Sequence, residues 1–120
     1  LCRYVEVLVN HRVAELKEKF ARVQSGELDL SEYLQDLQRA KEEFSVWQSL
    51  INDRLLRYYR TMDHDNVWYL HTQDRTANSL RSHMTSFGDW LEAADYYGTE
   101  EETIEFIGER VGELEEFRWE

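Results

Sequence analysis

Residues 28–62 carry the long helical pattern around which the chain is organised, and they read LDLSEYLQDLQRAKEEFSVWQSLINDRLLRYYRTM, without proline or glycine. Apolar residues recur every three or four positions in this stretch, which places them on one face of an α-helix. They are Leu30, Leu34, Leu37, Ala40, Phe44, Trp47, Ile51, Leu55, Tyr58 and Met62. A helix of about 33 residues is about 50 Å long. We therefore expect an elongated molecule, in which the other segments cover the apolar face of this helix.

Both ends of the stretch carry helix-boundary signals. Asp29 is a good N-cap residue, and Glu32 stands three positions later, as in a capping box. Arginines gather in the last turns, where the helix dipole favours cations. The polar residues 63–66, Asp-His-Asp-Asn, then suit a short connection to another helix.

Three further helices are expected. Residues 3–24 have a heptad-like, coiled-coil-type seam of Val9, Val13, Leu16, Phe20 and Val23, and the pair Ser25-Gly26 ends this helix. Residues 66–97 have a weaker apolar stripe, and Gly88 is a point where this helix can kink or break. The last helix opens with Thr99 as N-cap and Glu102 at the capping-box position, and its helical spacing continues to the end of the chain.

This pattern predicts an all-α fold, an elongated antiparallel helical bundle of about four helices with a long central hairpin. A length of 120 residues fits a single helical domain over 1–120. The chain starts with Leu-Cys and not with Met, so it also fits a fragment of a longer protein. The first and last helices are too short to cover the whole hairpin. We expect a homodimer or a partner protein to cover the remaining apolar surface.

The amino-acid composition limits the classes of partner that the chain can bind. The net charge is −11, from 25 acidic and 14 basic residues, which disfavours direct binding to nucleic acid or to anionic membranes. No run approaches the ~20 apolar residues of a membrane span. No signal peptide is evident, and Cys2 is the only cysteine, so the expectation is a cytoplasmic protein without an intrachain disulfide.

No catalytic or cofactor motif is present, and we expect a protein that is not an enzyme and binds no cofactor. The sequence lacks a glycine-flanked serine, a glycine-rich loop after a strand, and a His-Glu-x-x-His motif. A group of histidines and aspartates near the hairpin turn invites a metal hypothesis, but turn chemistry also accounts for it. The group is Asp63, His64, Asp65, His71 and Asp74, and no metal site is assigned to it.

Aromatic side chains away from the apolar seam are the main candidates for a protein interface. Tryptophan and tyrosine are typical anchors of such interfaces. The alternative is that they cover the flank of a neighbouring helix. The candidates are Tyr59, Trp68, Tyr69, Trp90 and Trp119.

The last segment also carries an acidic stripe with helical spacing. On a helix, successive carboxylates of this stripe would lie about 5 to 6 Å apart, a spacing comparable to that of phosphates on a nucleic-acid strand. The stripe is therefore either a solvated face or a mimic of a polyanion. It consists of Glu102, Glu105, Glu109, Glu113, Glu116 and Glu120.

These patterns favour a non-enzymatic protein-interaction, assembly or adaptor module that acts through helix–helix docking. The alternative is an acidic nucleic-acid mimic or inhibitor that occupies the groove of a nucleic-acid-binding protein. A second alternative is a helical-bundle sensor of a small molecule, based on the polar break between His71 and Asp74. Residues 54–83 have a local charge of +2, from five arginines and three aspartates. These arginines either bind an acidic partner or a phosphate, or satisfy helix ends and pair with nearby carboxylates.

Overall fold

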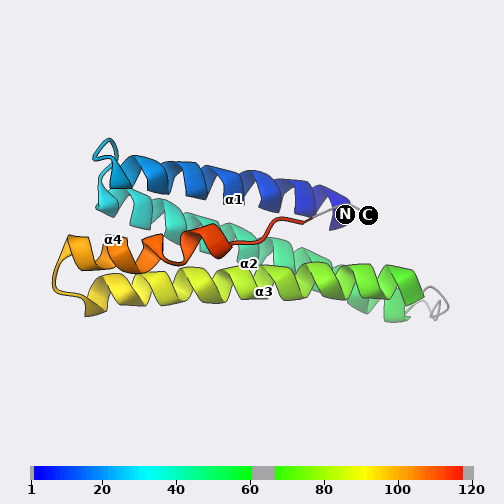
Figure 1. The fold of residues 1–120 in the computed structure, drawn as a ribbon. Coiled ribbons are helices and arrows are strands. Elements are labelled where there is room, and N and C mark those ends of the chain that lie inside the picture. The colour runs from blue at the N-terminus through cyan, green and yellow to red at the C-terminus, as the bar shows by residue number, and fades with distance from the viewer. Residues whose placement is uncertain (1, 61–66, 118–120) are drawn as a thin grey trace.

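The computed structural model describes the backbone of residues 2–60 and 67–117 and the side chains of residues 3–54 and 75–117. The described backbone contains no strand, and its elements are α1 (Cys2–Gln24), α2 (Leu30–Arg60), α3 (Val67–Tyr96), α4 (Glu100–Gly108) and the 3₁₀ turn η1 (Val111–Glu113). Helices α2 and α3 form a long antiparallel hairpin, α1 lies along α2, and α4 contacts both α3 and α1 (Figure 1). The molecule measures 54 × 27 × 18 Å. The predicted elongated all-α bundle is confirmed.

The core follows the apolar spacing of the sequence. The seam predicted for residues 3–24 is buried along the whole length of α1, with Val5 added at its start. On α2 the buried residues recur at the same helical spacing, from Leu30 to Ile51. Aromatic rings join the two long helices, because Phe44 of α2 lies 5.3 Å from Phe87 of α3 between ring centroids. Burial of these periodic faces is the main source of stability.

The hairpin extends beyond the start of α1 and beyond α4 (Figure 1). The shorter helices therefore do not reach this end of the hairpin, and the predicted exposure of apolar surface there stays a prediction. The side chains of the extending part fall outside those that the structure describes, as does the predicted turn at 63–66. Helix α3 continues through Gly88 without a break.

The turn between α1 and α2 uses glycine as predicted. Gly26 has φ +84°, a left-handed conformation that glycine adopts without steric cost. The amide groups of Glu27 and Leu28 both donate to the carbonyl of Arg22, at 2.9 and 3.2 Å. These bonds satisfy a carbonyl at the end of α1, so Gly26 terminates the helix as a C-terminal cap.

Buried ions connect α1 to α2, and the apolar pattern gave no indication of them. Arg12 Nη1 and Nη2 donate to the two carboxylate oxygens of Asp36, each at 2.8 Å, and Nη2 also donates to the Asp36 carbonyl at 3.1 Å. Lys19 Nζ donates to Asp36 Oδ2 at 2.9 Å. Glu15 accepts a further hydrogen bond from Arg12, and the Glu43 carboxylate lies 3.3 Å from Arg12 Nε. The two helices are thus joined by a bidentate, charge-assisted pair.

This environment sets the protonation of Asp36. Burial alone raises the pKa of a carboxyl group, but the hydrogen bonds from Arg12 and Lys19 outweigh it. They hold the pKa of Asp36 below its ordinary value of 3.8. Burial and the charge of Asp36 raise the pKa of the neighbouring Tyr33 hydroxyl, which therefore stays neutral.

A second buried carboxylate connects α1 to α3. The Glu6 side chain is 1% exposed, and Oε1 accepts hydrogen bonds from Arg75 Nη2 and Thr76 Oγ1, both at 2.8 Å. Arg75 also stacks on the ring of Phe117, with 5.7 Å from Cζ to the ring centroid. Arg75, one of the five arginines of residues 54–83, therefore makes its contacts within the molecule.

The predicted length of the last helix is wrong. Its start is confirmed, because the Thr99 side chain accepts a hydrogen bond from the Glu102 amide at 3.2 Å. However, α4 ends at Gly108, and after η1 the backbone is not helical over residues 114–117. Gly108 and Gly112 lower the helix propensity by up to about 1 kcal/mol each relative to alanine. Tertiary contacts then hold the segment, because Leu114 is buried and Phe117 pairs with Asn10 of α1.

Replacing Asn10 by alanine is expected to release the C-terminal segment from α1. The Asn10 side chain accepts from the Phe117 amide at 2.7 Å and donates to the Phe117 carbonyl at 2.9 Å. Loss of both bonds should lower the free energy of unfolding by about 1–2 kcal/mol. Hydrogen exchange should show faster exchange of the Phe117 amide. The control is Asn78→Ala, at an exposed position of α3, which should change neither quantity.

Candidate functional site

The structure decides between two roles for Trp90. This side chain is 2% exposed and packs edge-on against Phe87, with 5.8 Å between ring centroids. It therefore belongs to the core, and we exclude it from the candidate interface residues. The side chains of Tyr59, Trp68 and Tyr69 and all of Trp119 fall outside the described part of the chain, so their assignment to an interface stays a prediction.

A different set of apolar residues is exposed. Among the described side chains, five large hydrophobic ones are exposed, and four of them lie on two neighbouring helices. Tyr4 and Val7 of α1 are 66% and 53% exposed, and Val46 and Leu50 of α2 are 59% and 47% exposed. Each pair is about one helical turn apart, so its members share one side of their helix. We call these four residues the apolar patch.

The pairing of α1 with α2 places the two halves of the apolar patch at the same level. Arg12 contacts both Asp36 and Glu43, and the two helices are antiparallel. Residues that precede Arg12 on α1 therefore lie beside residues that follow Glu43 on α2. Tyr4 and Val7 lie about two turns before Arg12 on α1. At about 5.4 Å per turn, this is the level of the α2 segment that contains Val46 and Leu50. The two halves of the apolar patch therefore lie at the same level of α1 and α2, toward the end where α1 begins.

The acidic stripe is not the face of one helix. Glu102, Glu105 and Glu109 are exposed at α4, whereas Glu113 lies in η1 and Glu116 in the non-helical segment. Glu120 lies beyond the last described residue. The regular carboxylate spacing that suggested a polyanion mimic therefore ends where α4 ends.

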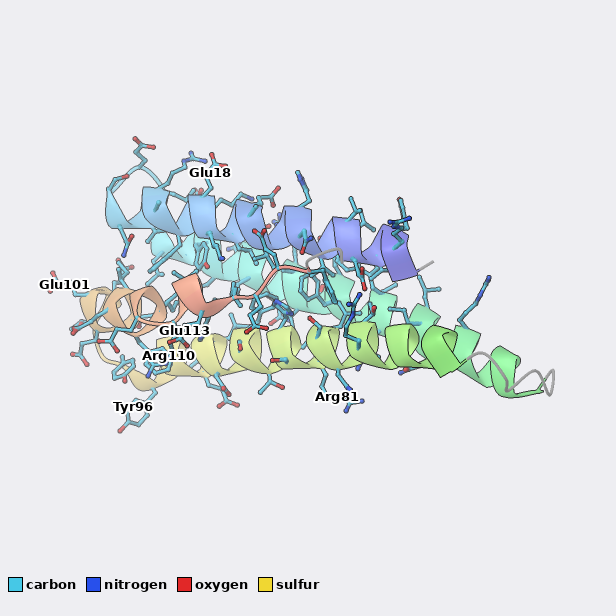
Figure 2. All side chains as sticks on the ribbon, turned by 45° about the vertical axis from the view of Figure 1, so that its right-hand side comes forward. Glu18, Arg81, Tyr96, Glu101, Arg110 and Glu113 are labelled. Carbon is cyan, nitrogen blue, oxygen red and sulfur yellow. The ribbon has the colours of Figure 1, made fainter. Side chains whose placement is uncertain are left out.

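Aromatic rings and carboxylates meet where α3 ends and α4 begins. Tyr97 contacts Tyr96 on one side and Phe106 on the other, with ring centroids 5.4 and 5.8 Å apart. A hollow of about 590 Å³ lies beside them, and an adjoining hollow of about 290 Å³ shares Tyr97 and Phe106. Tyr96 is 84% exposed and points away from the bundle (Figure 2). We call this surface the acidic-aromatic face; its residues are Asp89, Glu92, Asp95, Tyr96, Tyr97, Glu102, Glu105, Phe106 and Glu109.

A polar cleft of about 480 Å³ lies between α3 and the segment from Phe106 to Glu115. The imidazole of His83 lines this cleft and contacts backbone carbonyls on two sides. Nδ1 of His83 lies 2.7 Å from the Ser79 carbonyl, and Nε2 lies 2.9 Å from the Glu115 carbonyl. The Ser79 hydroxyl is farther away, at 3.5 Å from Nδ1. His83 therefore fixes the C-terminal segment against α3, and its arrangement with Ser79 is not that of a base activating a serine.

The remaining site hypotheses concern metals and membranes. Within the described residues, no three His, Cys, Asp or Glu side chains are grouped as metal ligands would be. The predicted group from Asp63 to Asp74, and with it the polar break at His71, lies outside the described side chains. None of the helices, over the ranges that the structure describes, is both long and apolar enough to cross a bilayer.

Comparison with known proteins gives no family. No family model matches the chain, and no curated protein and no solved structure matches it either.

Proposed function

We propose that this chain is a non-enzymatic protein-interaction module that self-associates through helix–helix packing at the apolar patch. The observation that supports the proposal is that Tyr4, Val7, Val46 and Leu50 are exposed at the same level of two adjacent helices. Contiguous exposed apolar side chains are uncommon on monomeric proteins, and they mark interaction surfaces. Two-fold symmetric dimers, in which the same surface meets itself, are the commonest oligomers.

The distribution of charge favours contact between two copies near the apolar patch. The chain carries −11 in total, so most of its surface repels a second copy. Residues 54–83, which continue from the apolar patch into the hairpin, have a local charge of +2. Two copies that meet near this region therefore experience the least repulsion. Tyr59, Trp68 and Tyr69 belong to the same stretch of sequence, and we predict that they extend the interface.

Introducing charge into the apolar patch tests the proposal. The double variant Val46→Arg/Leu50→Arg should weaken the dimer by about 100-fold or more, because it removes two apolar contacts and places cations in the interface. The measurement is the dimer dissociation constant by sedimentation equilibrium. The matched control is Gln35→Arg/Gln38→Arg, which adds the same charge at two exposed positions of α2 nearer its start.

The two variants separate interface effects from charge effects. We expect the control to keep the wild-type dissociation constant and both variants to keep the wild-type helix content. Equal dissociation constants for Val46→Arg/Leu50→Arg and the wild type would contradict self-association through the apolar patch. A wild-type protein that is monomeric at all concentrations would do the same.

A further inference from the structure

We propose that the acidic-aromatic face is a second binding site, and that it takes an arginine-containing segment of another protein. This site lies at the end of α3, away from the apolar patch, and does not depend on self-association. It offers three aromatic rings in contact, two adjoining hollows and a rim of carboxylates. Arginine side chains suit such a surface because the planar guanidinium stacks on aromatic rings and pairs with carboxylates.

The carboxylates of this face are available for a partner. Three of these carboxylates, Asp89, Glu92 and Asp95, lie on α3. The other three, Glu102, Glu105 and Glu109, lie on α4 and at its C-terminal end. Within the part of the chain that the structure describes, only Glu109 among these six pairs with a cation, Arg110 at 3.4 Å. That pair is exposed and therefore weak. An arriving cation gains the attraction of the rim without displacing buried ion pairs.

Arg110 already makes an arginine–aromatic contact at the acidic-aromatic face. The guanidinium of Arg110 lies over the ring of Phe106, 3.6 Å from its centroid, and Nη1 donates to the Phe106 carbonyl at 2.8 Å. Arg110 is the one base that lines either hollow of this face. The ring of Tyr97 contacts that of Phe106, and the ring of Tyr96 contacts that of Tyr97. A partner arginine can thus repeat on the tyrosines the contact that Arg110 makes on Phe106, and Arg110 competes with it for the phenylalanine.

The charge of the face also excludes other partners. Nucleic acids and anionic membranes are repelled by the six carboxylates. The same face of a second copy is repelled for the same reason. A basic protein segment is the partner class whose charge complements the face.

The test uses a synthetic peptide of about ten residues that alternates arginine and glycine, together with a lysine peptide of equal length and charge. Binding to the full chain is measured by calorimetry at low and at molar salt. The arginine peptide should bind at least about fivefold more tightly than the lysine peptide, because lysine lacks the planar stacking surface. Tyr96→Ala should weaken arginine-peptide binding about tenfold, and Phe106→Leu should act in the same direction. Arg110→Gln should tighten binding, because it removes the internal competitor.

Matched charge variants separate the face from general attraction by an acidic chain. Glu92→Gln/Asp95→Asn/Glu105→Gln removes three charges from the face, and Glu18→Gln/Glu42→Gln/Asp53→Asn removes three from exposed positions on α1 and α2. The first should weaken binding about tenfold or more, and the second less than about twofold. Equal losses in the two variants, equal affinity for the two peptides, or an unchanged affinity in Tyr96→Ala would overturn the proposal.

The result is independent of the dimer. Val46→Arg/Leu50→Arg should bind the arginine peptide within about twofold of the wild type, since exposed charges more than about 10 Å apart are largely screened at moderate salt. Failure of peptide binding with an intact dimer removes this inference alone. A wild-type chain that binds the arginine peptide but is monomeric at all concentrations removes the proposed function alone.

Discussion

Replacing Arg12 by alanine is expected to lower the free energy of unfolding by about 3 kcal/mol, because it removes one partner of a buried ion pair. The Arg12 side chain is 9% exposed and that of Asp36 is 11% exposed. The Asp36 carboxylate would keep only Lys19 as a charged partner, so the cost should fall at the lower end of the range for broken buried pairs. The measurement is chemical denaturation at a fixed low protein concentration.

Arg22→Ala is the matched control. Arg22 lies on the same helix, but its pair with Glu27, at 3.6 Å, is exposed. Exposed pairs contribute less than about 1 kcal/mol, so this variant should be near wild type. If both variants lost the same stability, the bidentate pair would not be what joins α1 to α2.

The effect of Arg12→Ala should depend on pH. The pKa of Asp36 is lower in the folded protein than its ordinary value of 3.8, so the charged form stabilises the fold above that value. This stability is lost as the pH falls below about 4 and passes through the folded-state pKa. The difference in unfolding free energy between wild type and Arg12→Ala should therefore be full at about pH 7 and shrink at acidic pH. A difference that stayed constant down to the lowest measurable pH would mean that the charge of Asp36 is not involved.

Replacing Trp90 by alanine is expected to cost about 3–5 kcal/mol of stability, the range for truncating a buried aromatic residue. Trp90 packs on Phe87, which in turn packs on Phe44, so its loss opens a cavity in the ring cluster that joins α2 and α3. Thermal denaturation should show a large decrease in Tm. Tyr96→Ala is the contrast, because Tyr96 is 84% exposed and its truncation should change stability by less than about 0.5 kcal/mol.

The two aromatic variants should also differ in binding. Tyr96→Ala is predicted to lose affinity for the arginine peptide while remaining folded, whereas Trp90→Ala should lose binding only as far as it unfolds. A stable Trp90→Ala protein with a weakened dimer would return Trp90 to the interface.

The sequence predicted the helices that obey a local pattern. The spacing from Leu30 to Ile51 and from Val9 to Val23 needs only helix geometry to place these residues inside, and both faces are buried. Gly26 and Thr99 act over a few residues, and both were predicted as helix-boundary residues. Local signals of this kind can be recognised in the sequence without knowing which distant residues contact them.

The features that the sequence did not predict depend on distant partners. The helical spacing from Ile104 to Phe117 resembles a helix, but the Phe117 amide bonds to Asn10, which is 107 positions away. The Asp36 partner of Arg12 is 24 positions away, and the Thr76 partner of Glu6 is 70 positions away. On a helical pattern, Arg12 and Glu6 look like solvated residues beside the apolar seam. Likewise Trp90 lies beside the predicted stripe of residues 66–97, and only its contact with Phe87 places it in the core.

The solution mass of the wild-type chain shows whether the apolar patch joins two copies. Light scattering after gel filtration, at low and at molar salt, gives this mass without a label or a variant. We predict a dimer at both salts, because burial of apolar side chains is not screened by ions and molar salt reduces the repulsion between two acidic chains. A monomer of 14.5 kDa at both salts would contradict self-association.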